Sequence, residues 1–128
     1  MGDKITISGN IQNSILNIKS TLTNVQQSVG NIPTQDESAR QELQGLIEQL
    51  RQALENVPDS QAEQAEAVAV SAQALVETAK ADKPNKTLLQ ISGDGLKKAA
   101  ENLSEVAPAV VGIATQVVTL VMRMKGLA

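Results

Sequence analysis

The chain has 128 residues, a length that suits one domain with a modest hydrophobic core. It contains no Phe, Tyr, Trp, Cys or His, which excludes disulfides, thiol chemistry and cysteine-based zinc sites. The net charge of −3 is unevenly spread, because residues 34–81 carry nine acids against three bases, whereas residues 82–128 carry four acids against six bases.

This composition restricts the functions that the protein can have. The acidic middle would repel a phosphate backbone and no aromatic side chain is present to stack on bases, so nucleic-acid binding is not expected. A core without aromatic side chains must be filled by Ala, Leu, Val and Ile, which requires close helix packing or burial across a subunit interface. The absence of cysteine and of a recognisable signal peptide at the start predicts a cytoplasmic location.

The first stretch, residues 3–18, fits two structures. Ile5, Ile7 and Ile11 alternate with Thr, Ser and Asn residues as in a β-strand, and Gly9 with the Asn after it suits a hairpin turn. A helix competes, because apolar residues recur every three or four positions. They are Ile11, Ile15, Ile18, Leu22, Val25, Val29 and Ile32. We favour an extended or hairpin arm through Ile18 followed by a helix over residues 20–29, and the choice between strand and helix stays open.

Two further helices have clear signals. Thr34 with Glu37, and Ser60 with Glu63, each form the pattern of a capping box at a helix start. The apolar stripe of the second helix consists of Leu43, Leu46, Ile47, Leu50, Ala53, Leu54 and Val57. The stripe of the third consists of Ala65, Val68, Ala69, Ala72, Leu75, Val76 and Ala79. Its alanines predict a close approach by a neighbouring helix.

A fourth helix is predicted over residues 85–107, although a strand over residues 87–91 is an alternative. Its apolar stripe is predicted to be Leu88, Ile91, Ser92, Gly95, Ala99, Leu103 and Val106. Gly93 and Gly95 either permit a close helix crossing or mark a break. Pro108 follows, so residues 85–125 form either one kinked helix or two helices.

Residues 106–122 contain no charge and are the most apolar stretch of the chain. We expect this segment to be the central or docking helix of the bundle, with apolar surface on almost every side. Val110, Val111, Val117, Val118 and Val121 keep the helical period. A membrane-inserting role for residues 106–125 is the alternative, but Pro108 and the polar residues within the segment make it the weaker one.

No motif predicts catalysis, a cofactor or a metal site. Residues 92–95, Ser-Gly-Asp-Gly, lack the further carboxylates of a calcium loop and the Gly-Lys frame of a phosphate loop, so a glycine-rich helix crossing is the better interpretation. The acidic pairs of the middle helices and the Lys97-Lys98 pair are expected on solvated faces. We therefore predict that the protein is not an enzyme and binds no cofactor.

The opening ITISGNIQNSILNIKSTLTNV and the closing KPNKTLLQISGDGLKKAAENLSEVAPAVVGIATQ resemble small bacterial domains, frequent in cyanobacteria. Those domains occur alone or fused to other modules in signalling and conflict-type proteins. The resemblance implies a bacterial, cytoplasmic interaction module and carries over no functional residues.

The sequence thus predicts a mainly α protein, a four- to five-helix bundle in a single domain over residues 1–128, with residues 1–18 as an arm for assembly and residues 19–128 as the bundle. The predicted function is a non-enzymatic module that self-assembles into a homo-oligomer or filament through the arm, or docks onto a partner protein. The predicted interface residues are Ile5, Ile7, Ile11, Ile15, Ile18, Val110, Val111, Val117, Val118 and Val121.

Overall fold

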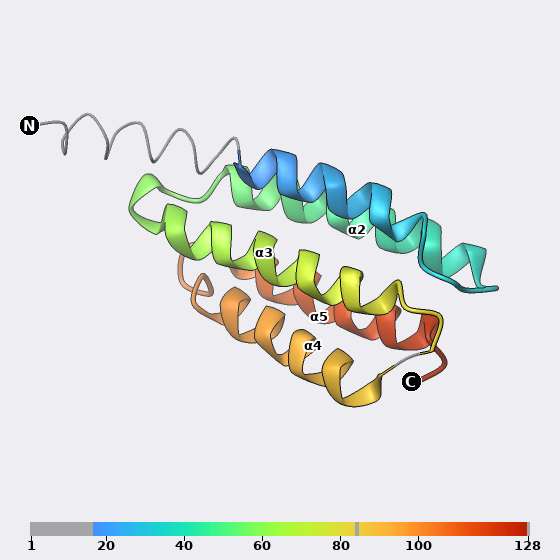
Figure 1. The fold of residues 1–128 in the computed structure, drawn as a ribbon. Coiled ribbons are helices and arrows are strands. Elements are labelled where there is room, and N and C mark those ends of the chain that lie inside the picture. The colour runs from blue at the N-terminus through green and yellow to red at the C-terminus, as the bar shows by residue number, and fades with distance from the viewer. Residues whose placement is uncertain (1–16, 84, 128) are drawn as a thin grey trace, which may run out of the picture.

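A computed structural model describes residues 17–83 and 85–127, and over these residues the protein is a bundle of α-helices (Figure 1). A helix over residues 17–29 is followed by α2 (Glu37–Glu55), α3 (Ala62–Ala79), α4 (Lys86–Glu101) and α5 (Pro108–Met124). A single 3-10 turn, η1 (Asp59–Gln61), leads into α3. The mainly α prediction is confirmed, and no strand occurs within the described ranges.

The helices run alternately up and down along the bundle (Figure 1). In space α5 lies against α2 and α4, and α4 also packs along α3. The 17–29 helix lies beside α2 and contacts α3 through a hydrogen bond from Ser28 to Glu77. The bundle is therefore closed on one side by its N-terminal helix.

Aliphatic side chains alone fill the centre of the bundle, and none of the described polar or charged side chains is buried. The predicted stripe of α3 is buried over its full length, and most of the α2 stripe is buried as well. Alanine at four of the seven buried positions of α3 lets α4 approach closely, which compensates for the absence of large aromatic side chains. The core is thus built from small aliphatic side chains between closely packed helices.

The first helix begins earlier than the predicted residue 20. Asn17, Ile18 and Lys19 are helical, and Ile18 is only 3 % exposed. Ile18, Leu22, Val25 and Val29 all face the core, as the helical alternative for this stretch requires. Ile18 therefore belongs to the bundle and not to an arm, and the boundary predicted after residue 18 is wrong.

Both predicted capping boxes are wrong in detail. The N-cap of α2 is Asp36, whose carboxylate accepts the Ala39 N–H at 2.9 Å, while the Thr34 hydroxyl accepts the Asp36 N–H. The N-cap of α3 is Gln61, which makes no side-chain capping bond, because the η1 turn supplies the entry to that helix. The two side chains accept from different backbone N–H groups, so Thr34 supports the turn before α2 and Asp36 caps the helix.

The fourth segment is helical, as favoured, but its predicted stripe is displaced. Leu89, Gly93, Leu96, Ala100 and Leu103 face the core. Of the residues predicted there, Leu88, Ile91, Gly95 and Val106 are exposed and Ser92 is half-buried. A turn at residues 102–106 then separates α4 from α5, so the segment is two helices, and Pro108 occupies the first turn of the second.

Gly93 marks the crossing of α4 and α5. A Cβ at this position would lie 2.9 Å from Cγ1 of Val118, so only glycine lets the two helices meet at this distance. Gly95 has no such role, because nothing lies within 4 Å of the corresponding Cβ position. The close-crossing interpretation of this glycine-rich stretch therefore holds at Gly93 alone.

Candidate interaction surface

The predicted interface residues of α5 lie inside the chain's own core. Val110, Val117 and Val121 are fully buried, Val118 is 6 % exposed and Val111 is half-buried. They pack against α2 and α4. A second molecule would reach them only if the bundle opened.

The outward side of α5 is small and polar and not apolar on every side as expected. Its exposed residues are Ala109, Gly112, Thr115, Gln116 and Thr119, with Pro108 and Arg123 at its two ends. Thr115 and Thr119 each donate a hydrogen bond to the carbonyl four residues earlier, which satisfies their hydroxyls on the helix itself. None of the helices in the described ranges is both long enough and apolar enough to span a membrane.

The predicted interface residues of the arm divide into two groups. Ile5, Ile7, Ile11 and Ile15 lie outside the described residues. Ile18 is described, and it packs in the core of the bundle.

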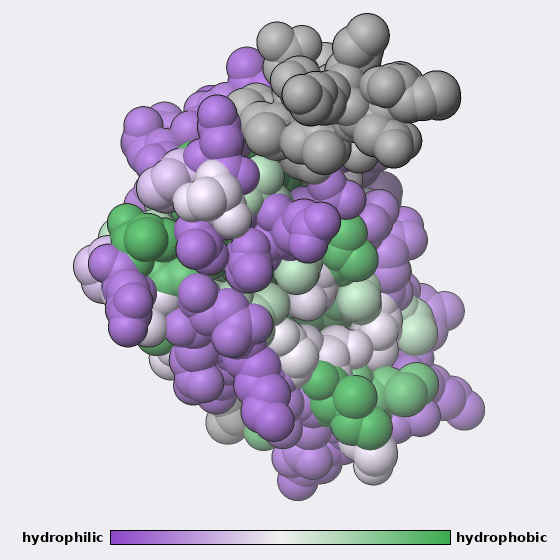
Figure 2. Space-filling model, turned by 90° about the vertical axis from the view of Figure 1, so that its left-hand side faces the viewer, coloured by the Kyte–Doolittle hydropathy of each residue, from purple (hydrophilic) through white to green (hydrophobic). Residues whose placement is uncertain are grey.

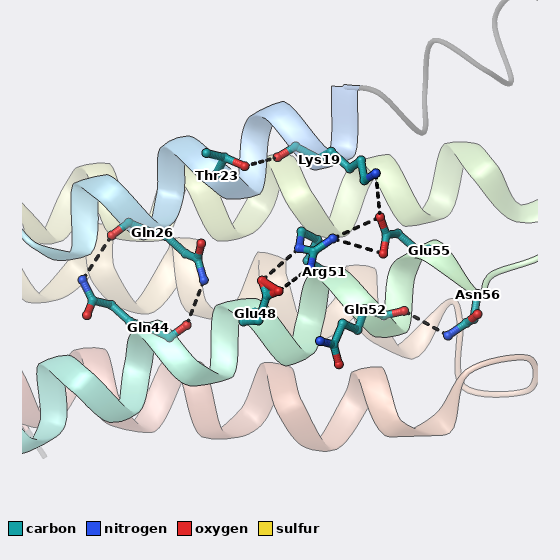
Figure 3. Close-up of polar contacts among 9 residues, drawn as sticks. All are labelled: Lys19, Thr23, Gln26, Gln44, Glu48, Arg51, Gln52, Glu55 and Asn56. Atoms are coloured by element: carbon teal, nitrogen blue, oxygen red, sulfur yellow. Dashed lines mark hydrogen bonds and ion pairs between the residues drawn. The ribbon is translucent and has the colours of Figure 1, made fainter.

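Polar side chains hold the 17–29 helix to α2 (Figure 3). Gln26 and Gln44 bond reciprocally, each side-chain amide donating to the main-chain carbonyl of the other, at 3.2 and 3.5 Å. Near the start of the 17–29 helix, Lys19 pairs with Glu55 at the end of α2, at 3.4 Å, and Glu55 also accepts a hydrogen bond from Arg51. This pattern fixes the register of the two helices.

Arg51 is the centre of the charged part of this seam. Its guanidinium contacts Glu48 and Glu55 on the same face of α2. The hydrogen bond to Arg51 lowers the pKa of Glu48, and the same bond raises the pKa of Arg51. The three side chains are partly exposed, so the cluster orients Glu55 toward Lys19 more than it adds stability.

A cleft of about 410 Å³ lies between α4 and α5. Lys86, Gln90, Asp94 and Lys97 line one wall, and Thr119 is on the other wall together with Val118, Met122 and Leu127. Charges of both signs face it, and the Thr119 hydroxyl is used by its own helix. No cluster of three metal-ligating side chains occurs among the described residues, and this cleft shows no nucleophile paired with a base.

A different surface carries exposed apolar side chains. Val70 on α3 is 50 % exposed, and Leu88 and Ile91 on α4 are 50 and 63 % exposed. Exposed small residues lie beside them at helical spacing, Ala67 and Ala74 on α3 and Gly95 on α4. We name these six residues the α3–α4 face: Ala67, Val70, Ala74, Leu88, Ile91 and Gly95.

Figure 2 views the bundle from one end and shows white and green atoms gathered on its right-hand side. That is the side on which α3 and α4 lie nearest to the viewer in Figure 1. The exposed positions of α3 are Glu63, Ala67, Val70, Ala74 and Glu77. Their three- to four-residue spacing makes an outward stripe whose middle is apolar and whose ends are acidic.

Sequence reasoning placed Leu88 and Ile91 in the core and so missed their exposure. Two apolar stripes exist in this helix, and both keep the helical period. The contact that separates them is the close approach of Val118 to Gly93, because glycine alone does not mark the inward side and Gly95 of the same helix is exposed. A stripe chosen to contain Gly93 leaves Leu88 and Ile91 on the outside.

In comparisons with protein-family models, with curated proteins and with solved structures, no match to this chain was found. The α3–α4 face is therefore the feature from which a function is inferred. Its shape and chemistry suit contact with another protein surface.

Proposed function

We propose that the protein is a non-enzymatic helical interaction module that docks through the α3–α4 face, either onto another copy of itself or onto a partner protein. The observation that carries this proposal is the exposure of Val70, Leu88 and Ile91 at 50, 50 and 63 %. Among the described residues they are three of the four large aliphatic side chains that are well exposed, and they belong to two adjacent helices.

The fold does not need these three side chains to be apolar. The cores of α3 and α4 are complete without them, since Val68, Leu75, Leu89 and Leu96 fill the positions that face inward. Apolar surface gains roughly 25 cal/mol for each Å² removed from water, so a contiguous patch is a surface that stabilises a complex. A bacterial, cytoplasmic setting is part of the proposal.

Substitution on the face separates docking from folding. Ile91→Glu places a charge on the α3–α4 face at an exposed helical position, so the variant should keep its helical circular dichroism and melting temperature. Thr115→Glu, at an exposed position of α5, is the matched control. Sedimentation velocity over a concentration series, and a pull-down with each variant as bait, measure self-association and partner binding.

The expected result is that Ile91→Glu loses association in at least one of the two assays while Thr115→Glu behaves as wild type. Equal behaviour of wild type, Ile91→Glu and Thr115→Glu in both assays would contradict the proposal.

Growth into filaments through the N-terminal segment is a separate proposal. Its basis is the alternation of Ile5, Ile7 and Ile11 with polar residues, a pattern typical of a strand that pairs with the edge of another copy. Deletion of residues 1–16 keeps Ile18 in the core and should lower the size of the assembly without loss of helicity. An unchanged assembly size after this deletion would refute it.

A further inference from the structure

We infer that the partner of the α3–α4 face is a second copy of this chain, related by a two-fold axis so that α3 of each copy packs antiparallel on α4 of the other. The inference rests on the proposed function and names its partner. Three observations support it: the relative level of residues on the two helices, the alternation of large and small side chains, and the charges around the face.

Two residues are level when they lie at the same height along the helix axes, and these heights follow from the turn between the two helices. Ala79 ends α3 and Lys86 begins α4, and the two helices run antiparallel from that turn. Val70 lies nine residues before the end of α3, and Gly95 lies nine residues after the start of α4, so the two are level. By the same count Ala74 is level with Ile91.

Two levels of the face therefore join one large and one small side chain. Val70 projects beside Gly95, where nothing lies within 4 Å of the missing Cβ, and Ile91 projects beside Ala74. A two-fold axis parallel to the helices keeps every residue at its level and lays α3 of one copy over α4 of the other. Val70 of each copy then fits over Gly95 of the second copy, and Ile91 fits over Ala74 of the second copy.

The charges favour this pairing over its alternative. Glu63, Glu66 and Glu77 are the only charged residues of α3, which contains no base. On α4, Lys98 is exposed and level with Ala67, one turn from Glu63. In the proposed dimer Lys98 of the second copy lies near Glu63, whereas α3 packed antiparallel on α3 about Val70 would set Glu63 against Glu77, with like charges opposed.

A two-fold interface of this kind uses the same face on both copies and leaves no second face free. The assembly through the α3–α4 face therefore closes at two copies and does not grow into a fibre. Filament growth, if it occurs, requires a different surface.

The cysteine-free chain allows a direct test by disulfide cross-linking. Val70→Cys and Gly95→Cys are made as separate full-length variants, and each is oxidised alone and in an equal mixture. A disulfide requires Cα atoms within about 7 Å, a spacing that closely packed small-residue helices reach. The expected result is a band at twice the 13.5 kDa chain mass in the mixture and little in either variant alone.

Filling the proposed recess gives an independent readout. Gly95→Leu should abolish the dimer in sedimentation velocity, whereas Gly112→Leu, at an exposed α5 glycine that is equally open, should leave it unchanged. Cross-linking of Val70→Cys alone as efficiently as in the mixture would overturn the α3-to-α4 pairing. A different outcome would be a wild-type protein that stays monomeric in sedimentation velocity, together with an Ile91→Glu variant that loses binding to another protein. That outcome would overturn the second copy as partner, while the proposed docking function would stand.

Discussion

The crossing of α4 and α5 at Gly93 makes a quantitative prediction. In Gly93→Ala the new methyl group lies 2.9 Å from Cγ1 and 3.6 Å from Cγ2 of Val118. Val118 is β-branched and lies in a helix, where one side-chain rotamer is strongly preferred, so it cannot turn away at low cost. The two helices must therefore separate by several tenths of an ångström.

The magnitude follows from two opposing effects. Overpacking a core contact costs about 1–3 kcal/mol, while replacing a helical glycine by alanine contributes about 0.5–1 kcal/mol. The net effect lies between about 0 and 2.5 kcal/mol, so Gly93→Ala should lower the free energy of unfolding by roughly 1 kcal/mol. Gly95→Ala meets nothing within 4 Å, so it should raise the free energy of unfolding by about 0.5–1 kcal/mol.

Urea denaturation followed by circular dichroism, at a concentration where the chain is monomeric, measures both variants. A double-mutant cycle with Val118→Ala identifies the cause, because the smaller side chain should remove most of the Gly93→Ala penalty. Gly93→Ala as stable as Gly95→Ala would refute the close crossing. A penalty that persists in the Val118→Ala background would place the strain elsewhere.

Three further predictions concern stability. Val117→Asp puts an unpaired charge at a fully buried position and should lower the free energy of unfolding by more than about 3 kcal/mol. Thr115→Asp at an exposed position should lower it by less than about 1 kcal/mol. Equal tolerance of the two substitutions in thermal melts would mean that α5 is peripheral. Asp36→Ala should destabilise the protein by about 1 kcal/mol in urea titrations through loss of the α2 cap, and no change would restore the capping-box alternative. The hydrogen bond from Lys80 lowers the pKa of Glu77 below 4.5, so this contribution is present above pH 4.5 and is lost as the pH falls through the folded-state pKa. Glu77→Gln should therefore flatten the dependence of stability on pH below about pH 4.5, and an unaltered slope would show that Glu77 contributes nothing.

The sequence predicts the core of α3 completely, because its longest apolar stripe, whose members are all Ala, Val or Leu, is the buried one. Periodicity alone did not decide α4, where Leu88 and Leu89 each begin a helical stripe. The close approach of Val118 selects the stripe that contains Gly93, and that contact joins residues far apart in the chain. Local patterns contain no information about such a contact.

The candidate interaction surface was not predicted for the same reason. The apolar character of residues 106–122 predicts a central or docking helix, and because α2 and α4 of the same chain cover its valines, they do not form a surface for a partner. Exposure of Val70, Leu88 and Ile91 becomes visible only when the inward faces of α3 and α4 are known. The heptad spacing from Ile18 onward was a correct signal for the first helix, because that helix closes the gap beside α2 and α3.

Methyl NMR of the wild-type protein as its concentration is raised tests the α3–α4 face most directly. The methyl groups of Val70, Leu88 and Ile91 should shift with concentration, while those of the buried Val110 and Val117 should stay in place. Shifts confined to other surfaces, or no shifts in a protein that nonetheless associates, would contradict the assignment of the α3–α4 face as the docking surface.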